Sequence, residues 1–92
     1  MLVLICRDGD VNSTIKENEG KIRMYFTESI KMAIDENMDY VKVFSILNTD
    51  IEVGVERKDF INVLDKNLMY FEEIENYEMC KEVLDLKNIL SI

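Results

Sequence analysis

The sequence predicts one α+β domain in which a small antiparallel sheet is covered by about three helices. Apolar runs at the N-terminus and between residues 41 and 55, the latter divided by turn-forming residues, predict three strands. Apolar positions that recur with a helical period over residues 21–37, and again from residue 58 onward, predict helices. With 92 residues the chain can close one hydrophobic core, so we expect a single domain over residues 1–92.

The N-terminal apolar run predicts a short buried strand from Leu2 to Cys6, ended by a turn at Asp8-Gly9-Asp10. Residues 11–20 are polar, and we expect them to form a loop. The apolar run is too short for a signal peptide or a membrane span, which predicts a cytoplasmic protein.

Residues 21–37 are expected to form a helix. The apolar stripe comprises Ile22, Phe26, Ile30, Ala33 and Ile34, and the opposite side carries Arg23, Thr27, Lys31 and Asp35. The alternation of Ile22, Met24 and Phe26 is also compatible with a strand over residues 21–26. We favour the helix because its period persists over about four turns.

A β-hairpin is predicted next, formed by Val41–Leu47 and Ile51–Val55 around the turn Asn48-Thr49-Asp50. In the second run, three β-branched residues alternate with glutamate and glycine, which indicates a strand with one buried face and one face in water.

From Lys58 to the C-terminus the pattern predicts a helical hairpin. Its first helix has Phe60, Leu64, Leu68 and Phe71 on one face, and its second helix has Met79, Val83, Leu86 and Leu90. The pattern breaks at Glu75-Asn76, where we place the turn between the two helices.

The composition argues against catalysis. The chain has no histidine, the commonest general base and metal ligand, and it has no glycine-rich phosphate loop. Cys6 and Cys80 lie in apolar runs and are expected to be reduced thiols, with a disulfide from the first strand to the last helix as the alternative. We therefore expect a protein that is not an enzyme and that needs no cofactor.

One polar segment resembles a metal site. Asp8, Asp10, Asn12 and Glu19 fall at positions 1, 3, 5 and 12 of a calcium-loop pattern. However, Ser13 takes the place of the turn glycine, and the preceding segment is a predicted strand rather than a helix. Asp8 and Asp10 also resemble the Asp-x-Asp of haloacid-dehalogenase phosphatases, which are much larger. We favour a polar turn, and a metal-dependent enzyme is the third functional hypothesis.

The charge of the chain points to the class of its partner. It has 19 acidic and 11 basic residues and a formal charge of −8. Such a protein is repelled by nucleic acids and anionic membranes and attracted to basic surfaces, of which DNA-binding proteins have the largest. The alternative is that the acidity only keeps a small protein in solution.

The carboxylates are arranged in rows. Glu78, Glu82 and Asp85 are spaced i, i+4, i+7 on the last predicted helix, about 5–6 Å apart. Phosphates along one DNA strand lie roughly 6–7 Å apart through space, so such a row can imitate them. The predicted phosphate-mimicking carboxylates are Glu72, Glu73, Glu75, Glu78, Glu82 and Asp85, extended by Glu28, Asp35, Asp39 and Asp65.

A second candidate surface is apolar. Leu68, Met69, Tyr70 and Phe71 are apolar on more sides of a helix than one buried stripe requires. We expect part of this run to pair two chains into a homodimer or to anchor a partner.

In its small size, its acidity, its lack of catalytic residues and its proline-free composition rich in Asn, Ile, Lys and Glu, the chain resembles an early phage protein. Among these it resembles the anti-restriction nuclease proteins of T-even phages, a family of DNA mimics of this length. The resemblance implies a homodimer in the host bacterial cytoplasm. Its acidic surface would occupy the DNA site of a restriction nuclease or a nucleoid-associated protein.

A second resemblance is local. Residues 68–90 are similar to the UvrB/UvrC helical-hairpin motif, whose aromatic-acid pair is matched by Tyr77 and Glu78, while Leu84 and Lys87 depart from it. This similarity favours a helical hairpin, while the two departures count against the docking role of the motif. The alternative function is a protein–protein interaction module that docks through its C-terminal hairpin, with the run Leu68 to Phe71 as its apolar anchor.

Overall fold

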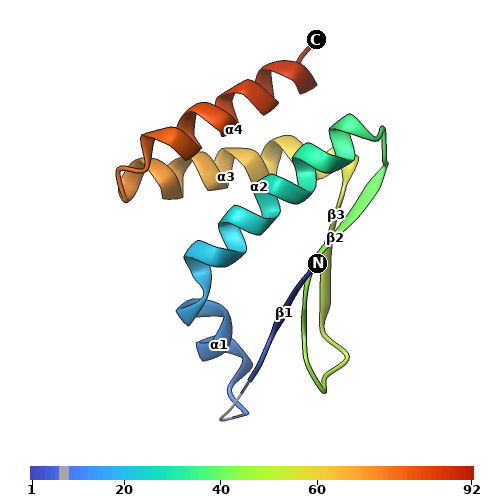
Figure 1. Cartoon of the computed structure of the whole chain (residues 1–92), viewed down its shortest axis with the longest axis vertical. Helices are drawn as coiled ribbons and strands as arrows, with labels where there is room; N and C mark the ends of the chain where they lie inside the picture. The colour runs from blue at the N-terminus through green and yellow to red at the C-terminus, as the bar shows by residue number, and fades with distance from the viewer. Residues whose placement is uncertain (7–8) are drawn as a thin grey trace.

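The computed structural model describes residues 1–6 and 9–92 and confirms the α+β class. The elements are β1 (Leu2–Leu4), α1 (Val11–Glu17), α2 (Glu19–Asp35), β2 (Tyr40–Ile46), β3 (Glu52–Glu56), a 3-10 turn (Arg57–Asp59), α3 (Phe60–Glu73) and α4 (Tyr77–Leu90) (Figure 1). The last two helices form the predicted hairpin. Among the described helices, none combines the length and the apolar character needed to cross a bilayer.

The three-stranded sheet has the order β1-β2-β3 and is mixed. The hairpin of β2 and β3 is antiparallel, as predicted. The expectation of an entirely antiparallel sheet is wrong for β1, which pairs parallel to β2 with Leu2 opposite Phe44 and Leu4 opposite Ile46. Two helices separate β1 from β2, so the chain crosses back and enters the sheet again in the same direction.

The loop predicted for residues 11–20 is also wrong, because most of this segment is helical. Asp10 caps α1: its carboxylate accepts hydrogen bonds from the Ser13 backbone N–H (3.2 Å) and hydroxyl (2.8 Å). Val11 and Ile15 are half-buried against the core, and α2 begins immediately after at Glu19. The helix over residues 21–26 is confirmed against its strand alternative.

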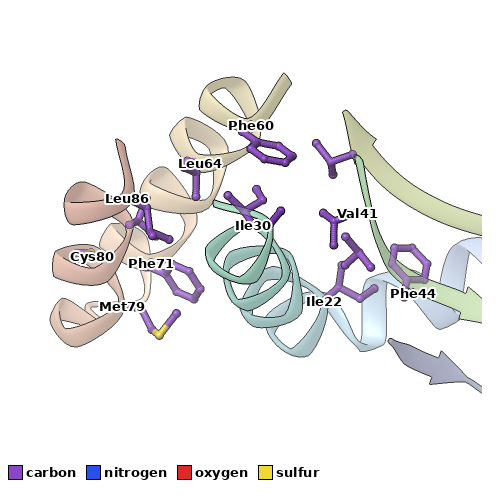
Figure 2. Packing of buried hydrophobic residues seen from close by; sticks show 14 of the residues in the cluster. Ile22, Ile30, Val41, Phe44, Phe60, Leu64, Phe71, Met79, Cys80 and Leu86 are labelled. Carbon is purple, nitrogen blue, oxygen red and sulfur yellow. The ribbon is translucent and has the colours of Figure 1, made fainter. Parts of the chain in front are cut away.

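Helix α2 lies between the sheet and α3 and is buried on two sides (Figure 2). Its apolar stripe includes Ile22 and Ile30, which belong to the hydrophobic core. Thr27, predicted on the solvent side, is fully buried at 0% exposure, and Arg23 is half-buried, because α3 covers that side of the helix. The result is a flat molecule with extents of 43 × 30 × 16 Å.

A buried polar cluster joins α2 to α3. The Asn67 amide nitrogen donates to the Arg23 carbonyl (3.1 Å) and the Thr27 hydroxyl (3.0 Å). The Asn67 amide oxygen accepts from the Arg23 guanidinium (3.1 Å). Asn67 is fully buried, and within residues 1–6 and 9–92 no buried side-chain polar atom lacks a hydrogen-bond partner. The cluster therefore fixes how the two helices meet.

The helical hairpin has its own part of the core. Phe60, Leu64 and Phe71 of α3 are buried, and Leu68 is half-buried beside them. From α4, Met79, Val83 and Leu86 are buried, as their spacing predicts, and Leu90 is half-buried. Cys80 is a buried free thiol, so it forms no disulfide.

We expect Asn67→Leu to lower the free energy of unfolding by about 1–3 kcal/mol, because it keeps the side-chain size but leaves the Thr27 and Arg23 groups without their partner. Urea unfolding followed by circular dichroism measures the change. Asn62→Leu, at an exposed position of the same helix, is the control and should shift it by no more than about 0.5 kcal/mol. Equal effects of the two substitutions would show that the cluster does not hold α2 to α3.

A candidate acidic surface on the helical hairpin

Six of the carboxylates predicted to mimic phosphates lie on the hairpin of α3 and α4. Glu72 and Glu73 end α3 and Glu75 lies in the turn, while Glu78, Glu82 and Asp85 lie on α4. Glu82 is partly exposed and the other five are exposed. We call these six side chains the hairpin carboxylates.

Little positive charge accompanies the hairpin carboxylates. Between residues 72 and 85 the only basic residue is Lys81, so six acids and one base give this segment a net charge of −5, out of −8 for the whole chain. The described part of the chain has five ion pairs, and none of them includes a hairpin carboxylate. Most of the excess negative charge thus lies at one end of the molecule.

The turn between the helices is well defined. Glu75 adopts a left-handed backbone conformation with φ of 59°. The Asn76 N–H donates to the Phe71 carbonyl (2.8 Å), and the Glu75 N–H to the Glu72 carbonyl (3.1 Å), which is the Schellman pattern of helix termination. The Asn76 side chain then caps α4 by accepting from the Met79 N–H (3.3 Å). The hairpin carboxylates therefore stand on a compact support.

Several hairpin carboxylates occupy positions that disfavour them. Glu72 and Glu73 lie in the last turn of α3, where the helix dipole opposes negative charge by about 0.3–1 kcal/mol per residue. Glu75 occupies a left-handed position that favours glycine or asparagine. Only Glu78, in the first turn of α4, has a favourable place relative to a dipole. These placements are expected to oppose the local stability of the hairpin turn.

Two of the other predicted acids have basic partners. A carboxylate oxygen of Asp39 lies 3.7 Å from the Arg57 guanidinium. A carboxylate oxygen of Asp65 lies 2.5 Å from the Lys87 ammonium. The fold brings each of these two acids beside a base that is distant in sequence, so each adds less net negative charge to the surface than an unpaired acid would.

The acids on α2 also have bases beside them. Glu28 and Asp35 lie on the exposed side of the helix, and Lys21 and Lys31 lie on that same side. Together these two acids and two bases carry no net charge. The candidate surface is therefore limited to the hairpin carboxylates.

The predicted apolar anchor is divided between the core and the surface. Phe71 is 1% exposed and belongs to the core, and Leu68 packs against it. The hydroxyl of Tyr70 rests on Gly20 of α2, and its ring lies 6.0 Å from the Arg23 guanidinium carbon. Met69 is 71% exposed. The run is apolar on several sides because α3 contacts both α4 and α2. Leu68, Tyr70 and Phe71 therefore have partners within the same chain, and Met69 is the exposed member of the run.

Two residues of the calcium-loop pattern, Asp10 and Glu19, have other roles in the structure. Asp8 lies outside them. Asp10 caps α1, and Glu19 begins α2 and lies 3.9 Å from Arg23. In residues 1–6 and 9–92 no three His, Cys, Asp or Glu side chains gather closely enough to hold a metal ion.

The structure also contains a groove that no sequence pattern indicates. A cavity of about 300 Å³ opens between α1, α2 and the sheet, with Ile15, Phe26 and Val53 among its lining residues. A second cavity follows β3 and shares Phe26 and Val53 with the first. The spacing of apolar residues could not reveal this groove, because one of its walls is α1, a helix that was predicted from the sequence as a loop.

Comparison of the chain with models of known protein families, with curated proteins and with solved structures gave no match.

The carboxyl pKa of Asp10 should lie below its ordinary value, because the Ser13 hydroxyl and then the Ser13 N–H donate to the carboxylate. A lowered pKa in the folded state means that Asp10 stabilises the fold above its unfolded pKa of about 3.8, and that this contribution disappears as the pH falls through the folded pKa. A carbon-detected NMR titration measures the pKa. Ser13→Ala should raise it, and an unchanged value would contradict the assignment of the cap.

Glu75→Gly should raise the free energy of unfolding by about 0.5–1 kcal/mol, because glycine adopts the left-handed conformation without a Cβ penalty. Thermal and urea unfolding measure the gain. Asn37→Gly provides the matched control, since Asn37 has a φ of 54° after α2 but asparagine tolerates this conformation. A loss of stability in Glu75→Gly would mean that the carboxylate itself supports the turn.

Proposed function

We propose that this protein inhibits a DNA-binding protein by presenting the hairpin carboxylates in place of DNA phosphates. The observation that carries the proposal is the concentration of charge: a net −5 between residues 72 and 85, in which no acid has an ion pair among the described residues. A basic DNA-binding groove is attracted to such a surface by charge alone.

The geometry of α4 supports this proposal. Glu78, Glu82 and Asp85 lie within about 60° of one another around the helix axis and advance along it by about 6 Å and 4.5 Å. The first step is close to the separation of phosphates along a DNA strand, roughly 6–7 Å through space, and the second is shorter. Met79, Val83 and Leu86 anchor the other side of α4 in the core, so the spacing is fixed before a partner binds.

The energetic placement of the acids supports a function over simple solubility. A surface selected only for solubility can carry its acids at positions where they do not affect the stability of a helix. Here Glu72 and Glu73 lie where the helix dipole disfavours a carboxylate, and Glu75 has a left-handed backbone conformation that disfavours its side chain. Residues that oppose local stability are expected at functional sites.

The resemblance to T-even anti-restriction nuclease proteins supports the class of target. On this proposal the target is a host restriction nuclease or a nucleoid-associated protein of a bacterial cytoplasm, and the inhibitor contains no catalytic residue. Pairing of two chains, which that resemblance also implies, would place two acidic surfaces in one particle.

A second candidate function is an interaction module that docks through apolar residues of the same hairpin. Ile74 is 51% exposed, Tyr77 69% and Leu84 46%. Tyr77 and Leu84 are seven positions apart and share one side of α4, next to the acidic row. Salt distinguishes the two candidates, since charge mimicry weakens steeply with ionic strength and apolar docking does not.

The test is competition for a DNA-binding protein. The chain should displace fluorescein-labelled duplex DNA from a bacterial histone-like protein or a restriction endonuclease, and the displacement should fade as salt rises. In the triple variant Glu78→Lys, Glu82→Lys, Asp85→Lys the concentration needed for half-displacement should rise at least tenfold, because three charges on one row are reversed and its net charge changes by six units.

A matched control separates position from total charge. Glu17→Lys, Glu36→Lys and Asp50→Lys together make the same six-unit change at three exposed acids outside the hairpin. This variant should displace DNA nearly as well as the parent. If both triple variants lose competition equally, only net charge matters, and a hairpin variant that competes like the parent would refute mimicry through α4.

A further inference from the structure

Strand β3 lies at the edge of the sheet, and within residues 1–6 and 9–92 it pairs only with β2. Two bonds fix which of its backbone groups face β2: the Arg57 N–H donates to the Asp39 carbonyl (2.7 Å), and the Ile46 N–H donates to the Ile51 carbonyl (3.1 Å). In an antiparallel pair, residues that face the neighbouring strand alternate with residues that face away.

This alternation decides which groups form the free edge. Residues 51, 53, 55 and 57 direct their N–H and C=O groups toward β2, and the bulge between Lys42 and Phe44 lies on β2, so the phase of β3 is unbroken. Glu52, Gly54 and Glu56 therefore direct theirs away from the sheet. A row of outward donors and acceptors is a template for one more strand.

The space beside this edge is a groove. The cavity that follows β3 has a volume of about 460 Å³ and is lined on the core side by Phe26, Val53 and Val63. It continues into the cavity of about 300 Å³ beside Ile15. A strand added to β3 would direct every second side chain toward this apolar groove.

The opposite side of the edge carries two glutamates and the lysines that pair with them. Glu52 and Glu56 lie on the outer face of the sheet on either side of Gly54, over which the Tyr40 side chain packs so closely that a Cβ would not fit. Both glutamates have exposed lysine partners, Lys42 and Lys58, each at 3.3 Å. Because both members of each pair are largely exposed, these ion pairs are weak, and a basic side chain of a partner can compete with the lysines.

We propose that β3 accepts an extended segment of a partner protein whose side chains alternate between apolar and basic. Apolar side chains would enter the groove, and two basic side chains four residues apart would face Glu52 and Glu56. A second copy of this chain fits less well, because antiparallel pairing of β3 with itself about Gly54 sets Glu52 opposite Glu56 twice, and like charges repel. This docking surface does not involve the hairpin carboxylates.

The probe is the peptide acetyl-Ser-Lys-Val-Thr-Val-Lys-Ser-amide, titrated into the isotope-labelled full chain and followed by NMR and amide hydrogen exchange. The chain carries the Glu78→Lys, Glu82→Lys and Asp85→Lys substitutions, so that a basic peptide is not held by the hairpin and the test is independent of the proposed function. We expect shifts at the amides of Glu52, Gly54 and Glu56, and exchange at these amides should slow at least tenfold in the bound state.

Two matched comparisons isolate the backbone pairing. Methylating the nitrogen of the central threonine removes one donor from the peptide without changing a side chain, and should weaken binding at least tenfold. In the protein, Glu56→Pro removes an outward N–H at a residue whose φ of −84° proline tolerates, whereas Glu56→Ala removes only the side chain. Proline should abolish binding, and alanine should weaken it less than threefold.

The remaining outcomes overturn the proposal. Equal binding of the methylated and parent peptides would show that no strand is added. Shifts confined to other elements would place the peptide elsewhere. A second copy would cover the edge if the amides of Glu52, Gly54 and Glu56 are protected from exchange without the peptide and this protection increases with protein concentration. Because the peptide comparison leaves the protein unchanged, it stands even if Glu56→Pro unfolds.

Discussion

The fold depends on α2 being covered on both sides. The sheet covers one side through apolar contacts of residues such as Ile22, and α3 covers the other through a polar cluster centred on Asn67. Because the sheet and the hairpin lie on opposite sides of α2, this helix is the element that joins them (Figure 1). A buried amide with all its partners in place allows essentially one alignment of two helices, whereas an apolar contact tolerates sliding.

The sequence predicts the elements with strong periodicity and misses those set by distant partners. Helices α2, α3 and α4 follow from apolar spacing over several turns. The burial of Thr27 and Asn67 could not be predicted, since each is polar and is satisfied only by the other helix. Helix α1 was not predicted because its few apolar residues, Val11 and Ile15, are too sparse to show a helical period. The direction of β1 depends on a crossover, which no local pattern encodes.

The candidate surface, too, was predictable where it depends on local spacing and not where it depends on contacts between distant residues. The six hairpin carboxylates are close in sequence, so their grouping and exposure could be anticipated from helical spacing. The compensation of Asp39 by Arg57 and of Asp65 by Lys87 depends on contacts between elements, and only the fold reveals it. The groove beside β3 likewise draws its walls from α1, α2 and the sheet. Acidic excess and the free strand edge thus belong to separate parts of one flat molecule.

The parallel pairing of β1 has a consequence for synthesis on the ribosome. Leu2 and Leu4 are synthesised before the two intervening helices, and their partners Phe44 and Ile46 only after them. Strand β1 must therefore remain without its neighbour while more than forty residues are translated, and at about 5–20 residues per second this interval lasts for seconds. The hydrogen bonds of α2 are local, so this helix can begin to form in that time, before β1 pairs with β2.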